Sequence, residues 1–83
     1  MAGQPKHVQV SDWIRERILY GEFKKGSKLL SENELAKRFG ISRQTVRQAV
    51  GTLVNERMLE RRRGSGTYIS YQPKPIREKT GNI

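Results

Sequence analysis

The sequence has no cysteine and one histidine, His7, and both facts limit the kinds of catalytic and metal site that it can form. Without cysteine there is no disulfide framework, no thiolate zinc site and no cysteine nucleophile. A single histidine makes a metal site only beside a cluster of acidic residues, and the sequence shows none. The serines form no nucleophile-and-base pattern with His7. We therefore expect no enzyme activity, no metal and no cofactor.

Long hydrophobic runs are also missing. No stretch approaches the 18 or so apolar residues of a membrane span, and no signal-peptide core is present. We therefore expect a soluble cytoplasmic protein. The length of 83 residues allows one small domain, which buries roughly 60–65% of the surface that its unfolded chain exposes. There is room for one core and one binding face, which excludes large two-domain catalysts.

Acidic residues are scarce compared with basic ones. The chain holds 17 Lys and Arg against 8 Asp and Glu, a formal charge of +9. Two thirds of this excess lies in residues 41–83, which carry +6, against +3 in residues 1–40. An unbalanced basic surface attracts a polyanion, more often nucleic acid than an anionic membrane. The alternative is a charged surface that serves solubility alone.

Apolar periodicity predicts a first helix over residues 8–20, with Val10, Ile14 and Ile18 four residues apart and Gly21 at its end. The second helix follows Ser31 and runs for about eight residues. Ser31 and Glu34 have the spacing of a capping box, and a glycine at position 40 is typical of a helix end.

Ser42 is the expected N-cap of a third helix. Its predicted apolar face consists of Val46, Ala49, Val50, Leu53 and Val54. Because only residues 40–42 separate it from the second helix, the pair forms a helix-turn-helix.

After residue 58 the pattern changes to that of strands. Residues 59–62 and 67–70 flank a glycine-rich turn at 63–66, which predicts a β-hairpin that must pack on the helices. The expected fold class is therefore α+β, a winged helix-turn-helix with three helices and a two-stranded wing. We expect a disordered start at residues 1–4, the domain at 5–70, and a linker at 71–83 that leads toward an effector domain absent from this sequence.

The third helix presents Arg43, Gln44 and Arg47 opposite its apolar face. Arg pairs bidentately with guanine and Gln with adenine in the major groove of DNA, while Ser42 and the helix N-terminus can hold a phosphate. Positions 43 and 47 are one turn apart, so both arginines reach the same groove. The alternative is that these side chains serve solubility.

The wing carries an arginine triplet at 61–63 followed by Gly64, Ser65 and Gly66. Alternation along a strand puts Arg61 and Arg63 on one side and Arg62 on the other. These cations either flank a duplex near the minor groove or form a solvated loop.

The sequence allows two interpretations for each of two further residues, Glu32 and Gly51. Glu32 either stabilises the second helix, because its negative charge lies near the positive end of the helix dipole, or accepts a hydrogen bond from cytosine. Gly51, inside the third helix, marks either a close approach of another element or a tolerated weakness that costs about 1 kcal/mol.

These stretches together resemble the DNA-binding domain of the GntR family of bacterial transcription regulators. The resemblance covers about residues 5–70 and is carried by LSENELA at 30–36, FGISRQTVRQA at 39–49, LVNE at 53–56 and GSGTYIS at 64–70. It implies a winged helix that binds an inverted-repeat operator as a homodimer, in the cytoplasm of a bacterium and associated with the nucleoid. By position it implies DNA contacts from Arg43, Gln44, Arg47, Thr45, Ser42, Ser31, Glu32, Lys6, Arg62, Arg63, Ser65 and Gly66.

Family members usually carry Gly where this chain has Arg57, and often Arg where it has Asn33. Residues 5–10, 32–35 and 49–51 look closer to the arabinose-repressor branch, in which a GntR-type head joins a LacI-type sugar-binding domain. The resemblance therefore implies a head released from DNA when a sugar binds the missing domain. One alternative is a winged helix that contacts RNA or protein. Another is a basic membrane-surface module, which is disfavoured because the core needs the apolar stripes and leaves none for lipid.

Overall fold

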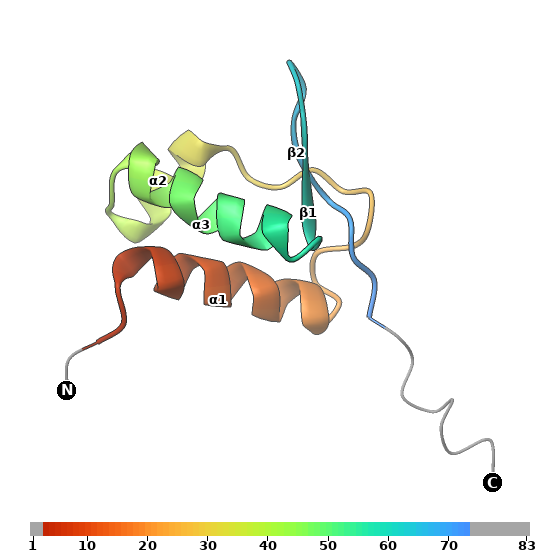
Figure 1. Ribbon diagram of the computed structural model, residues 1–83, viewed down its shortest axis with the longest axis horizontal. Helices are drawn as coiled ribbons and strands as arrows, with labels where there is room; N and C mark the ends of the chain where they lie inside the picture. Colours follow the sequence, from red (N-terminus) through yellow and green to blue (C-terminus); the bar gives the residue numbers. More distant parts are fainter. Residues whose placement is uncertain (1–2, 74–83) are drawn as a thin grey trace, which may run out of the picture.

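The computed structural model describes residues 3–73 and confirms the winged-helix arrangement. In chain order the elements are α1 (Lys6–Leu19), α2 (Glu32–Phe39), α3 (Arg43–Asn55), β1 (Leu59–Arg62) and β2 (Gly66–Ile69). Figure 1 shows α1 and α3 lying along one another, with α2 at one end and the hairpin standing out at the other. The domain therefore offers α3 and the wing side by side. Residues 1–2 and most of the predicted linker, 74–83, lie outside the described residues.

One hydrophobic core joins all the elements. It takes Val10, Ile14 and Ile18 from α1 and the predicted apolar face from α3, where Val46, Ala49, Val50 and Leu53 are buried. Leu35 is the buried residue of α2, and Leu59 and Ile69 anchor the two strands. Because every element places at least one apolar side chain here, the core fixes the position of α3 relative to the wing.

The start of α1 differs from the prediction. The helix begins at Lys6 rather than at residue 8 and ends at Leu19 rather than at residue 20. Pro5 is the residue before the helix, and its carbonyl oxygen accepts from the backbone N–H groups of Val8 and Gln9 at 3.0 and 3.1 Å. Proline has a fixed φ suited to helix starts and lacks the N–H that would go unpaired there, so the helix can begin two residues before the predicted start.

The predicted caps of α2 and α3 are confirmed. Ser31 Oγ accepts from the backbone N–H of Glu34 at 3.1 Å, and the Glu34 carboxylate accepts from the Ser31 N–H at 2.9 Å. Gly40 ends α2 with a left-handed φ of 66°, and Ser42 Oγ accepts from the Thr45 N–H at 3.1 Å. These local bonds set the short turn that aims α3.

A third, short segment pairs with the wing, and the sequence pattern did not predict it. Strands β1 and β2 pair antiparallel with Arg61 opposite Thr67, and β2 covers residues 66–69 rather than the predicted 67–70. On the other side of β2, Lys28 forms a bridge with Tyr68, and Leu29 donates its N–H to the Thr67 carbonyl at 2.8 Å. The segment that precedes α2 therefore holds the wing from its outer edge.

Arg15 ties α1 to the end of α3. Its guanidinium donates two hydrogen bonds to one Glu56 oxygen and a third to the other, at 2.8–3.1 Å, and it also pairs with Asp12 at 2.6 Å. Burial alone would lower the pKa of Arg15, but the carboxylates of Glu56 and Asp12 outweigh it and raise the pKa. The guanidinium therefore stays charged, and the contact pins the α3 exit to α1.

The exit of α3 uses a left-handed residue that is not glycine. Arg57 has φ 65°, its N–H bonds to the Val54 carbonyl at 2.9 Å, and the next N–H, of Met58, bonds to the Leu53 carbonyl at 2.9 Å. This is the Schellman pattern of helix ends, which normally has glycine at this position. A left-handed φ costs a residue with a side chain about 1–2 kcal/mol.

We therefore expect Arg57→Gly to raise the free energy of unfolding by about 0.5–1 kcal/mol, since the relieved strain exceeds the added freedom of the unfolded chain. Arg57→Ala is the control, because it removes the same side chain but keeps the strain. Chemical denaturation of both variants checks the prediction. Equal stabilities of the Gly and Ala variants would contradict it.

Candidate nucleic-acid interface

The exposed face of α3 carries the predicted reading residues together. Arg43, Gln44 and Arg47 are all exposed, while the opposite face is buried. Arg43 and Arg47 are separated by one helical turn and project to the same side. The face therefore presents two guanidiniums and an amide at spacings that base edges can accept, and their contacts with DNA remain predictions.

The cap hydroxyls stand at the start of this face. Ser42 is exposed and Thr45 is half-buried, and their side-chain oxygens lie 2.9 Å apart. Ser31, the cap of α2, is exposed as well. Both α2 and α3 therefore present an N-terminus with a hydroxyl at the surface, an arrangement suited to a phosphate oxygen.

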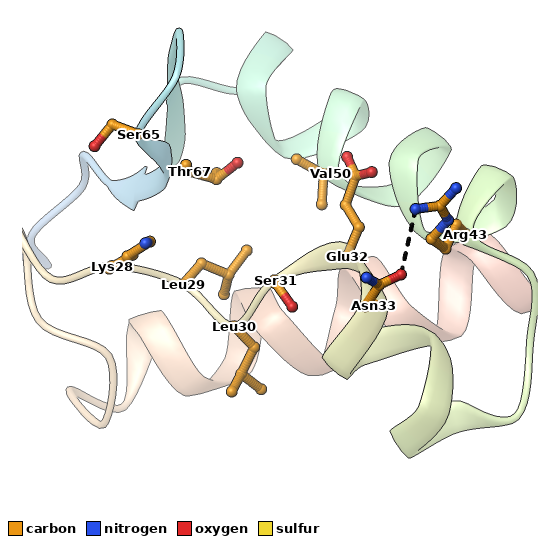
Figure 2. Close-up of a pocket in the computed structure, with 11 residues that line it drawn as sticks. Lys28, Leu29, Leu30, Ser31, Glu32, Asn33, Arg43, Val50, Ser65 and Thr67 are labelled. Atoms are coloured by element: carbon orange, nitrogen blue, oxygen red, sulfur yellow. Dashed lines mark hydrogen bonds between the residues drawn. The ribbon is translucent and has the colours of Figure 1, made fainter.

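Residues at the start of α2 hold the two arginines of α3. Glu32 Oε1 accepts from Arg47 Nη2 at 3.3 Å. Asn33 Oδ1 accepts from Arg43 Nη1 at 3.4 Å, the bond that Figure 2 marks. Glu32 lies in the first turn of α2, where its charge suits the helix dipole. The contacts are long and the arginines are exposed, so they orient the guanidiniums without locking them.

A hollow of about 330 Å³ separates the wing from the helices. Figure 2 shows Thr67 of the wing directed toward Glu32 across it, while the Ser65 hydroxyl points away from the helices and lies 2.6 Å from the Tyr68 hydroxyl. Ser31 and Gly66 also line the hollow. Five of the predicted contact residues, from three elements, therefore surround one space: Ser31, Glu32, Arg43, Ser65 and Gly66.

Gly66 has a local structural reason to be glycine. Its φ is 133°, and a Cβ built there would lie 2.7 Å from Cε of Lys28. The backbone φ strains any residue with a Cβ at this position, whereas the flexible end of the Lys28 side chain could move aside. Lys28 was not among the predicted site residues, because its place beneath the wing depends on the edge pairing of the segment before α2.

The three arginines of the wing point to different surroundings. Arg62 stacks on the Tyr68 ring, with Cζ 4.3 Å from the ring centroid, and its Nε lies 3.4 Å from Glu60. Arg63 is exposed in the turn, since β1 ends at Arg62. Arg61 instead reaches α3, where its Nη2 donates to the Arg47 carbonyl at 3.2 Å. The predicted site named Arg62 and Arg63 but missed Arg61.

Lys6, the remaining predicted contact, is exposed at the first position of α1. Its role stays a prediction. Among residues 3–73, no group of three His, Asp or Glu side chains could hold a metal ion, and none of the three helices has the length and apolar character to cross a membrane.

The comparisons with known proteins agree with this geometry. The mannosyl-D-glycerate transport/metabolism system repressor MngR of Escherichia coli (strain K12) is 48% identical over 69 residues, which are 83% of this chain and 29% of that protein. The arabinose metabolism transcriptional repressor of Geobacillus stearothermophilus is 44% identical over 71 residues, 86% of this chain and 19% of that protein. This chain thus spans less than a third of either relative.

A similar solved structure is that of the AraR DNA-binding domain in complex with operator ORR3. It is 38% identical, has a TM-score of 0.81, and 83% of each chain is covered. The family of bacterial regulatory proteins called the gntR family matches residues 6–69, which include all three helices and the whole wing. The chain belongs to the GntR family of bacterial regulatory proteins.

Proposed function

We propose that this chain is the sequence-specific duplex-DNA-binding head of a bacterial transcriptional repressor. The observation that carries the proposal is the exposed α3 face, where Arg43, Gln44 and Arg47 lie beside a hairpin wing. A relative of the same fold is solved in complex with an operator, which supports this assignment. No catalytic role or cofactor is part of the proposal.

Binding begins with electrostatic capture. The charge of +9 attracts the duplex without regard to sequence, and this part of the affinity falls as salt rises. Contacts of phosphates with the N-termini of α2 and α3 then fix the register. Discrimination comes last, when Arg43 and Arg47 donate to guanine edges and Gln44 pairs with adenine.

A dimer on an inverted repeat is the arrangement we propose on DNA. One domain of this size covers a single half-site, and two copies related by a twofold axis read the same bases on opposite strands. The contacts within one copy come from α3 in the major groove and from Arg63, Ser65 and Gly66 at the wing.

Genes of carbohydrate use, of which arabinose is one example, are the proposed targets. The support is that the relatives are named as repressors of mannosyl-D-glycerate and arabinose metabolism. Both are more than three times as long as the matched region, so we place the sugar effector in a part of the protein beyond this domain. The protein would act in the bacterial cytoplasm, where the DNA is.

Competition binding tests the proposal against an RNA or membrane partner. A labelled duplex enriched by this chain from a random pool is titrated with three competitors: a scrambled duplex, an RNA duplex of the same sequence, and vesicles of anionic lipid. Because each mismatched base pair costs about 1–3 kcal/mol, we expect the unlabelled enriched duplex to compete at least about tenfold better than any of them. Equal or better competition by RNA or vesicles would contradict the proposal.

A further inference from the structure

Arg61 lies on the recognition face although it belongs to the wing. Along β1, Leu59 is buried against the core, and Arg61 projects from the same side of the strand two residues later. Its side chain therefore runs toward α3, where Nη2 donates to the carbonyl oxygen of Arg47 at 3.2 Å. One guanidinium from the hairpin is thus fixed on the helix backbone.

The place that it occupies is that of a missing side chain. Positions 43, 47 and 51 are each four residues apart and share one side of α3. Arg43 and Arg47 fill the first two positions, but Gly51 has no side chain, and a Cβ built there would lie 4.0 Å from Arg61 Nη2. The wing therefore supplies a third guanidinium to a row of two. A methyl group at 51 would make only ordinary van der Waals contact with Arg61, so the guanidinium takes the space that a longer side chain at 51 would need.

The guanidinium of Arg61 keeps its charge available. A guanidinium has five N–H donors, and the bond to the Arg47 carbonyl uses one of them. Among residues 3–73 the ion pairs of arginine involve Arg15, Arg17, Arg47 and Arg62, and Arg61 is not one of them. It also borders an open hollow of about 270 Å³ shared with Gln44, Arg47 and Gln48.

The place of the Arg61 guanidinium along α3 determines which part of the DNA this group would contact. Position 51 lies eight residues beyond Arg43, or about 12 Å along the helix axis. The major groove is only about 12 Å wide and 8.5 Å deep, and a recognition helix enters it by its N-terminal residues. The Arg61 guanidinium, held between the Arg47 carbonyl and Gly51, therefore lies about 6–12 Å further along the axis than Arg43, toward the phosphates that border the groove.

We propose that Arg61 binds a backbone phosphate at the edge of the major groove, held in place beside Gly51 by the Arg47 carbonyl. A guanidinium suits this task because its planar fork can bond a phosphate while one N–H stays on the carbonyl. The contact is independent of sequence, so it adds affinity and fixes register. This inference rests on the proposed duplex-binding function.

Salt titration of three variants tests it on the enriched duplex and on a scrambled duplex. Arg61→Ala removes the whole contact, and Arg61→Gln removes the charge but keeps an amide donor for the Arg47 carbonyl. Lys25→Ala is the matched control, since Lys25 is an exposed cation in the segment between α1 and α2. Circular dichroism confirms that each variant is folded.

We expect both Arg61 variants to weaken binding to the two duplexes by the same factor. The slope of log K against log salt should fall by about 0.9, the value for one phosphate contact. Raising the salt from 50 to 200 mM should then cost the variants about 3.5-fold less affinity than the parent. Lys25→Ala should leave the slope unchanged.

Three other results would overturn the assignment. An unchanged slope with a lower melting temperature means that Arg61 only braces the wing. A loss confined to the enriched duplex means that it reads a base. A normal slope in Arg61→Gln, with a reduced slope in Arg61→Ala, means that the charge is not what binds. A parent chain that enriches no duplex would contradict the proposed function itself, which separates the two failures.

Discussion

Arg43→Ala weakens binding to the enriched duplex by about 1–3 kcal/mol, or roughly five- to 150-fold, while binding to a scrambled duplex changes far less. The reason is that Arg43 is exposed at the first turn of α3, the part of the helix that enters the groove. A lost bidentate pair with guanine removes discrimination, whereas nonspecific attraction depends on the whole charge of +9. Parallel anisotropy titrations with both duplexes measure the effect.

Lys25→Ala again serves as the control, because it removes one positive charge away from α3. The ratio of the two affinities is the quantity that decides. It should fall in Arg43→Ala and stay at the parent value in the control. If Arg43→Ala lowers both affinities equally, Arg43 contacts phosphate and the assignment of base reading to this residue is wrong.

Leu35→Ala destabilises the domain by about 2–5 kcal/mol. Leu35 is 0% exposed and is the one residue of α2 that is buried in the core. An eight-residue helix does not hold together alone in water, so α2 depends on this anchor. The melting temperature should fall by at least roughly 8 °C, as measured by circular dichroism.

The same helix supplies an internal control. Lys37 is exposed on α2, and Lys37→Ala should change the free energy of unfolding by no more than about 0.5 kcal/mol. Because Glu32 and Asn33 orient the two arginines from the start of α2, any Leu35→Ala protein that remains folded should also discriminate duplexes less well. A Leu35→Ala variant as stable as Lys37→Ala would contradict the role of Leu35 as the anchor.

Local chemistry explains which parts of the fold could be predicted. Ser31, Gly40 and Ser42 act through bonds to residues no more than four positions away, so their spacing alone identified the turn that aims α3. The apolar face of α3 was likewise readable from its period. The start of α1 was not, since Pro5 begins that helix before the apolar stripe does.

Contacts between residues far apart in the chain could not be predicted from the sequence. Arg61 meets Arg47 across 14 positions, and Lys28 pairs beside Tyr68 across 40, and neither contact has a local pattern. Alternation along β1 correctly separated Arg61 from Arg62, but it could not say which side faces α3. That choice follows from the burial of Leu59, which only the packed core reveals. Arg61 does lie beside Gly51, but a Cβ there would make only an ordinary contact with it, so the packing does not require glycine at this position.

Selection of bound sites from a pool of random DNA duplexes tests the central claim most directly. If α3 reads bases through Arg43, Gln44 and Arg47, the chain should enrich an inverted repeat whose half-sites contain guanine and adenine at fixed positions. Half-site centres should lie about one helical turn apart, or a multiple of it. A pool that remains random after repeated rounds, although the chain binds it in a salt-dependent way, would contradict the claim.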